Sequence, residues 1–259
     1  FEIYMIVFVL LEVSFTIFDY FIVRKTAGSL RPLIIFKMVK NIFKFSIPIG
    51  VASIIGMINI EVDKLTISHF FSTEELGIYS ACSAELPLTV VASSISSVAL
   101  PVMVSLIKNG EISKAIEKWK KTVVVSFAII VIFAVGLFFF AEDAVLLLYG
   151  EKYLPGANVF RIYSIVLLFK CTYFGMILNS YGKTKLILFS STISLLCNIG
   201  LNYLFYSMFG FIGPALSTLV STLIMNLIQL VATSRISKIK FIDIFPWRQM
   251  FVLLLLCLT

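Results

Sequence analysis

Long apolar runs make up most of this chain, and they restrict its possible folds more than any other feature. A membrane-spanning helix needs about 20 predominantly apolar residues, and seven runs reach that length. They cover residues 1–23, 45–68, 78–107, 122–148, 155–180, 186–207 and 211–233. An eighth run, residues 251–258, is too short to cross, so we expect a truncated span in a fragment of a longer protein.

The composition supports a membrane protein and excludes two other classes. Hydrophobic residues form 60% of the 259 residues and charged residues 14%, whereas soluble domains are about 25% charged. A soluble enzyme would need more polar surface, and a disordered chain would be less hydrophobic. The runs are too long and uniform for barrel strands, and helices satisfy the backbone in lipid. The sequence therefore predicts an all-α polytopic membrane protein, a helical bundle with about eight transmembrane segments.

Lysine and arginine are concentrated in alternate connections between these spans. Seventeen of the 21 basic residues lie at 24–44, 108–121, 183–185 and 235–248, and the intervening connections contain only Lys152. The positive-inside rule places the basic connections in the cytoplasm. We therefore predict a multi-pass protein of the cytoplasmic (inner) membrane. The basic residues that produce its net charge of +7 would face the anionic surface of the lipid bilayer, so no nucleic-acid partner is expected.

Two of the basic connections are amphipathic. Lys37, Lys40 and Lys44 recur at helical spacing with apolar residues between them, which is typical of a helix lying in the headgroup layer. Trp119 is surrounded by lysines, which predicts an interfacial anchor. Both connections can act purely as topological charges and anchors, or they can bind a partner or regulator.

Ionisable residues within the spans are candidates for function, because charges at hydrocarbon depth are costly. Counting along the helices predicts an outer group on three spans. Its members are Glu61, Asp63, Lys64, Glu85 and Arg161. Glu61 and Lys64 are three residues apart and share a helix face. The group either forms neutralising ion pairs and snorkelling side chains, or it closes the outer side of a cavity as a gate.

Three residues are candidates for a substrate pathway: Lys170, Arg161 and Glu12. Lys170 is predicted in the inner half of the membrane with no acid in its own span, so it either contacts an anionic group or snorkels. Arg161 and Lys170 are nine residues apart, on opposite sides of a straight helix. Glu12 is near the middle of the first span.

The third span is long and contains two helix breakers. Pro87 and Pro101 predict a kinked helix, and Ser93, Ser94, Ser96 and Ser97 give it a polar face. Such a face borders a cavity in many transporters, or it packs closely against a neighbouring helix. The single histidine, His69, and four isolated cysteines predict no metal site, and no cofactor or catalytic site is expected.

Five stretches within about residues 44–233 are distinctive in their order and spacing: KFSIPIGVASIIGMINIEVDKL, GIYSAC, YGEKYLPGANVFRIYS, NSYGKTKL and NIGLNYLFYSMFGFIGPALSTLVST. Together they resemble polysaccharide repeat-unit flippases of the O-antigen, Wzx-like type. They include Asp63, Lys64, Asn198 and Asn202, whereas Pro214 departs from the small residue usual in that family. The resemblance implies the multidrug/oligosaccharidyl-lipid/polysaccharide exporter superfamily, in which two six-helix bundles surround a central cavity.

The resemblance also implies a domain organisation and an activity. Residues 1–23 would be the last helix of the amino-terminal bundle, residues 24–44 a cytoplasmic linker, and residues 45–259 an incomplete carboxyl-terminal bundle. The implied activity is transfer of undecaprenyl-pyrophosphate-linked oligosaccharide between leaflets for polysaccharide or lipopolysaccharide biosynthesis, alongside other membrane proteins of polysaccharide assembly. The alternatives are a cation-coupled multidrug exporter of the same superfamily and, more remotely, a membrane-embedded transferase.

Overall fold

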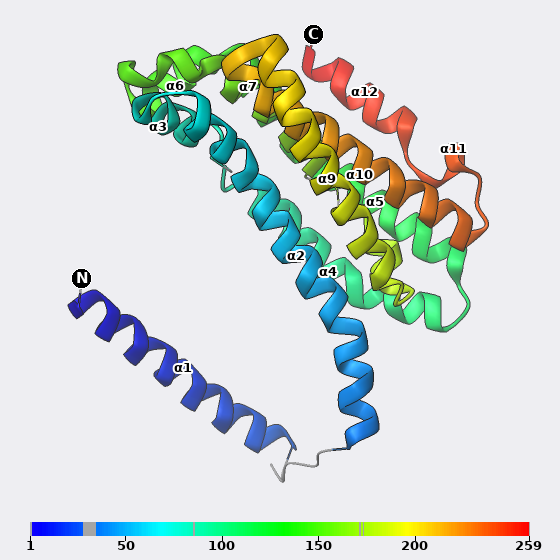
Figure 1. The fold of residues 1–259 in the computed structure, drawn as a ribbon. Coiled ribbons are helices and arrows are strands. Elements are labelled where there is room, and N and C mark those ends of the chain that lie inside the picture. Colours follow the sequence, from blue (N-terminus) through cyan, green and yellow to red (C-terminus); the bar gives the residue numbers. More distant parts are fainter. Residues whose placement is uncertain (1, 28–34, 85, 171, 173, 259) are drawn as a thin grey trace. The chain divides into compact units, whose positions relative to one another are not determined.

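The computed structural model describes residues 2–27, 35–84, 86–170, 172 and 174–258. Every regular element in these ranges is helical (Figure 1). Five stretches of the described residues are long and apolar enough to cross a membrane, and one of them, Thr184–Ser237, contains two consecutive helices. The prediction of an all-α polytopic membrane protein is confirmed. The chain divides into two units, Phe1–Phe43 and Lys44–Thr259.

The first unit contains helix α1 (Glu2–Ala27) and the first turns of α2 (Phe36–Phe70). The side chains from Met5 to Thr26 on α1 are exposed. Lys37 and Lys40 lie in the first turns of α2, which continues without a break into the next apolar run. The helical conformation expected from the amphipathic spacing is confirmed for these turns. Their place in the headgroup layer stays a prediction. Residues 28–34 of the predicted linker lie outside the described residues.

In the second unit, the described residues form the rest of α2 and ten further α-helices. These are α3 (Thr73–Cys82), α4 (Leu88–Lys108), α5 (Ile112–Phe139), α6 (Ala141–Tyr149), α7 (Ala157–Lys170), α8 (Met176–Ser180), α9 (Thr184–Phe209), α10 (Gly213–Ser237), α11 (Phe241–Ile244) and α12 (Trp247–Leu258). Two 3₁₀ turns, Glu151–Gly156 and Gly210–Ile212, precede α7 and α10.

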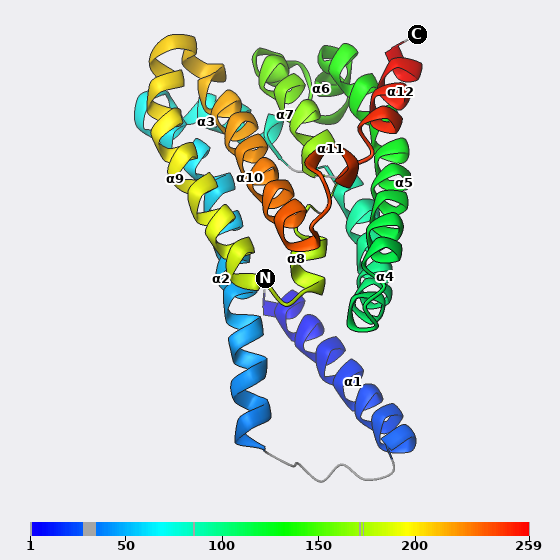
Figure 2. The ribbon, with the colours of Figure 1, turned by 90° about the vertical axis from the view of Figure 1, so that its right-hand side faces the viewer.

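The connections of the second unit lie at two opposite ends. Figures 1 and 2 show the α4–α5 and α8–α9 connections and the carboxyl end of α10 at one end, and the α2–α3, α6–α7 and α9–α10 connections at the other. The first set contains the basic residues that the charge pattern predicts to be cytoplasmic. The fold thus agrees with the predicted alternation of connections, whereas the side of the membrane stays a prediction.

Three predicted spans are interrupted. The run 78–107 is divided between α3 and α4, and Pro87 directly precedes α4, where its missing N–H costs no helical hydrogen bond. The run 122–148 is divided at Phe140 between α5 and α6, and the run 155–180 after Lys170 between α7 and α8. Charged residues adjoin the last two breaks, with Glu142 and Asp143 just after Phe140 and Lys170 at the end of α7, but the prediction treated each run as one continuous span.

Helix α5 begins ten residues before the predicted start of its span, so the lysine-rich segment is helical. Trp119 on this segment is 0% exposed, packed in a core with Phe174 and Phe245. Its ring centroid is 5.9 Å from that of Phe245. The predicted interfacial anchor is therefore wrong: Trp119 joins α5 to the segment between α10 and α12.

Helices α9 and α10 form a closely packed hairpin. Gly213 opens α10, and a Cβ atom there would lie 2.4 Å from the carbonyl carbon and oxygen of Phe205 on α9. Only glycine permits this approach of two backbones. Pro214 occupies the first turn of α10, where a proline is favourable. Pro214, which differs from the small residue usual in the resembling family, is therefore compatible with a regular start of α10.

Candidate functional site

A buried carboxylate, Asp63, lies at the junction of five helices in the second unit. Asp63 is on α2 and is 0% exposed. Its Oδ2 atom accepts hydrogen bonds from the hydroxyls of Thr218 (2.6 Å), Tyr163 (2.8 Å) and Tyr79 (3.2 Å). Its Oδ1 atom accepts one from Nδ2 of Asn202 at 3.1 Å. Helices α3, α7, α9 and α10 each donate one hydrogen bond to this carboxylate.

Asn198 connects this carboxylate cluster to a second layer of polar groups. Nδ2 of Asn198 donates to Oδ1 of Asn59 (3.0 Å) and to the Thr218 hydroxyl (3.3 Å). Oδ1 of Asn198 accepts from the Ser217 hydroxyl (2.6 Å) and from Nδ2 of Asn202 (2.6 Å). Oδ1 of Asn202 is buried and has no hydrogen-bond partner among the described groups.

The chemistry of this cluster follows from its atoms. Carboxylate, amide and hydroxyl oxygens can bind a proton or coordinate a hard cation. Among the described salt bridges, none includes Asp63. The expectation that Asp63 forms an ion pair is wrong for the described contacts, because its donors are all neutral, whereas its membership of an outer gate stays a prediction.

The other described members of the predicted outer group have different ion-pair partners. The predicted proximity of Glu61 and Lys64 is confirmed, since Lys64 Nζ is 2.9 Å from Glu61 Oε1. Arg161 instead contacts Glu142, with Nη2 at 3.2 Å from Oε1. Its Nε also donates to the carbonyl of Phe138, near the end of α5 (3.1 Å). Arg161 thereby fixes the corner between α5 and α6. Glu85 lies outside the described residues.

A cavity of about 670 Å³ lies in the second unit, bordered by α2, α4, α9, α10 and the end of α7. Much of its lining consists of small hydroxyl and amide side chains. These are Ser53, Thr89, Ser93, Ser96, Ser97, Thr172, Ser191, Thr222, Asn226 and Gln229. Three serines of the predicted polar face thus border a cavity, and Ser94 is not among the described lining residues.

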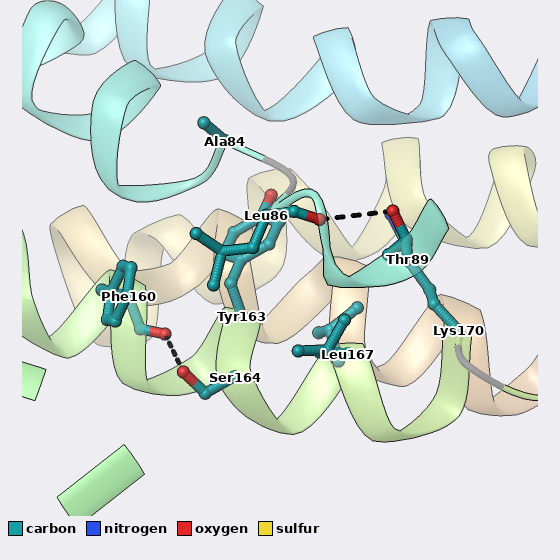
Figure 3. Close-up of a pocket in the computed structure, with 9 residues that line it drawn as sticks. Ala84, Leu86, Thr89, Phe160, Tyr163, Ser164, Leu167 and Lys170 are labelled. Carbon is teal, nitrogen blue, oxygen red and sulfur yellow. Dashed lines mark hydrogen bonds between the residues drawn. The ribbon is translucent and has the colours of Figure 1, made fainter. Parts of the chain in front are cut away.

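Lys170 is the one ionisable side chain among the described residues that line this cavity. It also lines a smaller adjoining pocket with Tyr163 and Thr89. Figure 3 shows its side chain extending from the end of α7 towards Thr89 at the start of α4. Arg161 is not among the described residues that line the cavity, which agrees with the predicted separation of the two cations.

Glu12 lies in the middle of α1, in the unit Phe1–Phe43, and its side chain is exposed. Its role in a substrate pathway stays a prediction.

Sequence reasoning missed the partners of Asp63. Asn198 and Asn202 were noted for their family resemblance, and their spacing of four residues places them on one face of α9. Polar residues at that spacing inside an apolar run were a usable signal. Tyr79, Tyr163 and Thr218 gave no comparable signal, because their meeting at Asp63 depends on the packing of three other helices.

Comparisons with known proteins identify relatives and a common fold. The family described as "Polysaccharide biosynthesis protein" matches residues 3–158. A capsular polysaccharide biosynthesis protein, CapF of Staphylococcus aureus, is 26% identical over 185 residues, which cover 70% of this chain and 47% of that protein.

Two solved structures share the fold. The lipid II flippase MurJ, in an inward closed conformation, has a TM-score of 0.65 at 22% identity, over 88% of this chain and 48% of that one. A multidrug resistance MATE transporter of the MOP superfamily, in an outward-facing conformation, has a TM-score of 0.64 at 17% identity, over 83% of this chain and 50% of that one. The chain thus spans about half the length of these proteins. Its fold is that of half a MOP-superfamily transporter, and the chain belongs to the polysaccharide biosynthesis protein family.

Proposed function

We propose that this chain forms the carboxyl-terminal half of a transporter that moves lipid-linked oligosaccharide units, carried on undecaprenyl pyrophosphate, across the cytoplasmic membrane. In this proposal residues 1–23 end the amino-terminal bundle, residues 24–44 form the linker, and residues 45–259 belong to the carboxyl-terminal bundle. Family membership supports a role in polysaccharide assembly. The matched relative is named for capsular polysaccharide, so the glycan class need not be that of an O-antigen.

The observation that carries this proposal is the cavity whose wall combines hydroxyl and amide side chains with Lys170. Sugars offer many hydroxyls, and the serine, threonine and amide side chains of the wall can donate to them and accept from them. A pyrophosphate group is anionic, and Lys170 is the described lining residue that can provide a positive charge. The wall therefore offers hydrogen-bonding groups for the sugars and a positive charge for the pyrophosphate of a lipid-linked oligosaccharide.

A cation-coupled multidrug exporter of the same superfamily is the second candidate. The buried carboxylate of Asp63 favours it, because such exporters require an acid that can take up a cation. Lys170 disfavours it, because a positive charge at the cavity wall repels cationic drugs. Export of a cationic dye without movement of lipid-linked oligosaccharide would favour this candidate.

Substitutions of Lys170 test the proposed function in the complete transporter. Movement of lipid-linked oligosaccharide between leaflets is measured in proteoliposomes, with the amount of inserted protein held equal. We expect Lys170→Gln to lose most of the activity and Lys170→Arg to retain most of it, because the guanidinium keeps the charge. Lys183→Gln removes an exposed lysine in the α8–α9 connection and serves as the control. Normal activity of Lys170→Gln would assign Lys170 a snorkelling or structural role.

A further inference from the structure

The carboxyl end of α7 lies at the cavity wall. Helix α7 ends at Lys170, and α8 begins at Met176, within one apolar run. The last four carbonyl groups of an α-helix have no partner inside the helix. The carbonyl of Phe169 is one of these, and an unpaired carbonyl in apolar surroundings is costly.

Asn226 on α10 provides the missing donor. Its Nδ2 atom lies 3.2 Å from the carbonyl oxygen of Phe169. Asn226 is 6% exposed, although it lines the cavity. Since a carbonyl can only accept, the NH₂ group of the amide must face the end of α7.

A second connection joins α7 to α10 farther up the helix. The hydroxyls of Tyr163 and of Thr218 both donate to Asp63. Tyr163 and Lys170 are seven residues apart and therefore lie on one face of α7. At the helix end, Asn226 adds a polar contact from α10 to the last turn.

We propose that Asn226 is a positioning residue for Lys170. By holding the carbonyl of Phe169, it fixes the last turn of α7 and therefore the backbone from which Lys170 extends along the cavity wall. The benefit to transport rests on the proposed function, in which Lys170 contacts an anionic head group. The positioning itself does not depend on that role.

The chain offers a matched control on the same helix. Gln229 lies three residues after Asn226, is 5% exposed and also lines the cavity. Its Nε2 atom donates to the Ser190 hydroxyl on α9 at 3.0 Å, and not to α7. Asn226→Leu and Gln229→Leu therefore each remove one buried cavity amide from α10, but only the first removes the donor to the Phe169 carbonyl. Asn226→Ala, which avoids any clash, is tested alongside.

The first measurement is the rate at which an amine-directed acylating reagent modifies Lys170, followed by peptide mass spectrometry in the complete transporter. Because a freed helix end changes the exposure of the Lys170 amine, we expect a change of about threefold or more in both Asn226 variants, comparable to the loss of one buried hydrogen bond. Gln229→Leu should leave the rate unchanged. Equal rates in all four proteins, or equal changes in the Asn226 and Gln229 variants, would overturn the positioning role.

The second measurement is transport as a function of substrate concentration. We expect Asn226→Ala to raise the apparent KM for lipid-linked oligosaccharide about tenfold, since small displacements of a binding group are costly, and to change the maximal rate little. Combined with Lys170→Gln, it should add no further loss, because both changes remove one interaction. Additive losses would overturn the positioning role. A changed acylation rate together with normal transport by Lys170→Gln would retain the positioning and reject the head-group site.

Discussion

The hydroxyl of Tyr163 donates a 2.8 Å hydrogen bond to Oδ2 of Asp63, although 100 residues separate them in sequence. This bond connects α7, which ends at the cavity, to α2, whose carboxylate also receives donors from α3, α9 and α10. The buried carboxylate of Asp63 therefore connects α2 by hydrogen bonds to four other helices, three of which border the cavity.

Removing the Tyr163 hydroxyl tests this role. Tyr163→Phe keeps the ring and deletes one of four donors to Asp63, so we expect a loss of stability of about 1 kcal/mol. Thermal unfolding of the purified protein in detergent measures the change. Tyr203→Phe is the matched control, since Tyr203 is 69% exposed on α9. Equal effects of the two substitutions would contradict a specific contribution of the Tyr163 bond.

Exchange of Glu61 and Lys64 tests whether their ion pair matters for transport. The pair is not enclosed by the protein, with the Glu61 side chain 60% exposed, so each neutralisation should change stability by less than about 1 kcal/mol if the pair faces water as predicted. If the pair closes a gate, the exchanged variant Glu61→Lys/Lys64→Glu should transport better than either Glu61→Gln or Lys64→Gln. An exchanged variant as impaired as the single ones would show that pairing is not what transport requires.

Cysteine labelling tests the orientation. In a background without the four native cysteines, single cysteines at Ser113 and Lys183 should react only from the cytoplasm, and those at Thr73 and Asp143 only from outside. All four positions are exposed, and the positive-inside rule assigns their sides. Labelling of positions 113 and 73 from the same side would contradict the alternation of the connections.

Gly213→Ala tests the approach of α9 and α10. The added Cβ would lie 2.4 Å from the carbonyl group of Phe205, so the two backbones must separate, and we expect a loss of about 1–3 kcal/mol. Gly200→Ala is the control in α9, where a Cβ meets nothing within 4 Å. That change should be neutral or stabilise by about 0.5–1 kcal/mol. Similar unfolding temperatures for both variants would show that the hairpin tolerates the separation.

The sequence by itself determined the class of fold. Apolar runs of sufficient length force helices, because lipid offers the backbone no hydrogen-bond partner. The alternating lysines and arginines predicted which connections share an end of the second unit, and the serines around Ser96 predicted a polar face that does border a cavity. The pairing of Glu61 with Lys64 was predictable because it depends only on helical spacing.

Tertiary structure alone decided the interruptions and the contacts between distant segments. The breaks at Phe140 and after Lys170 lie within runs that the sequence predicted as single spans. Carbonyl groups beside these breaks accept hydrogen bonds from other helices, from Arg161 and from Asn226. Asp63 was predicted among ion pairs because depth counting gives no information about which helices surround a side chain. Its neutral donors come from four helices, and such a meeting depends on how helices pack, which no local pattern of residues encodes.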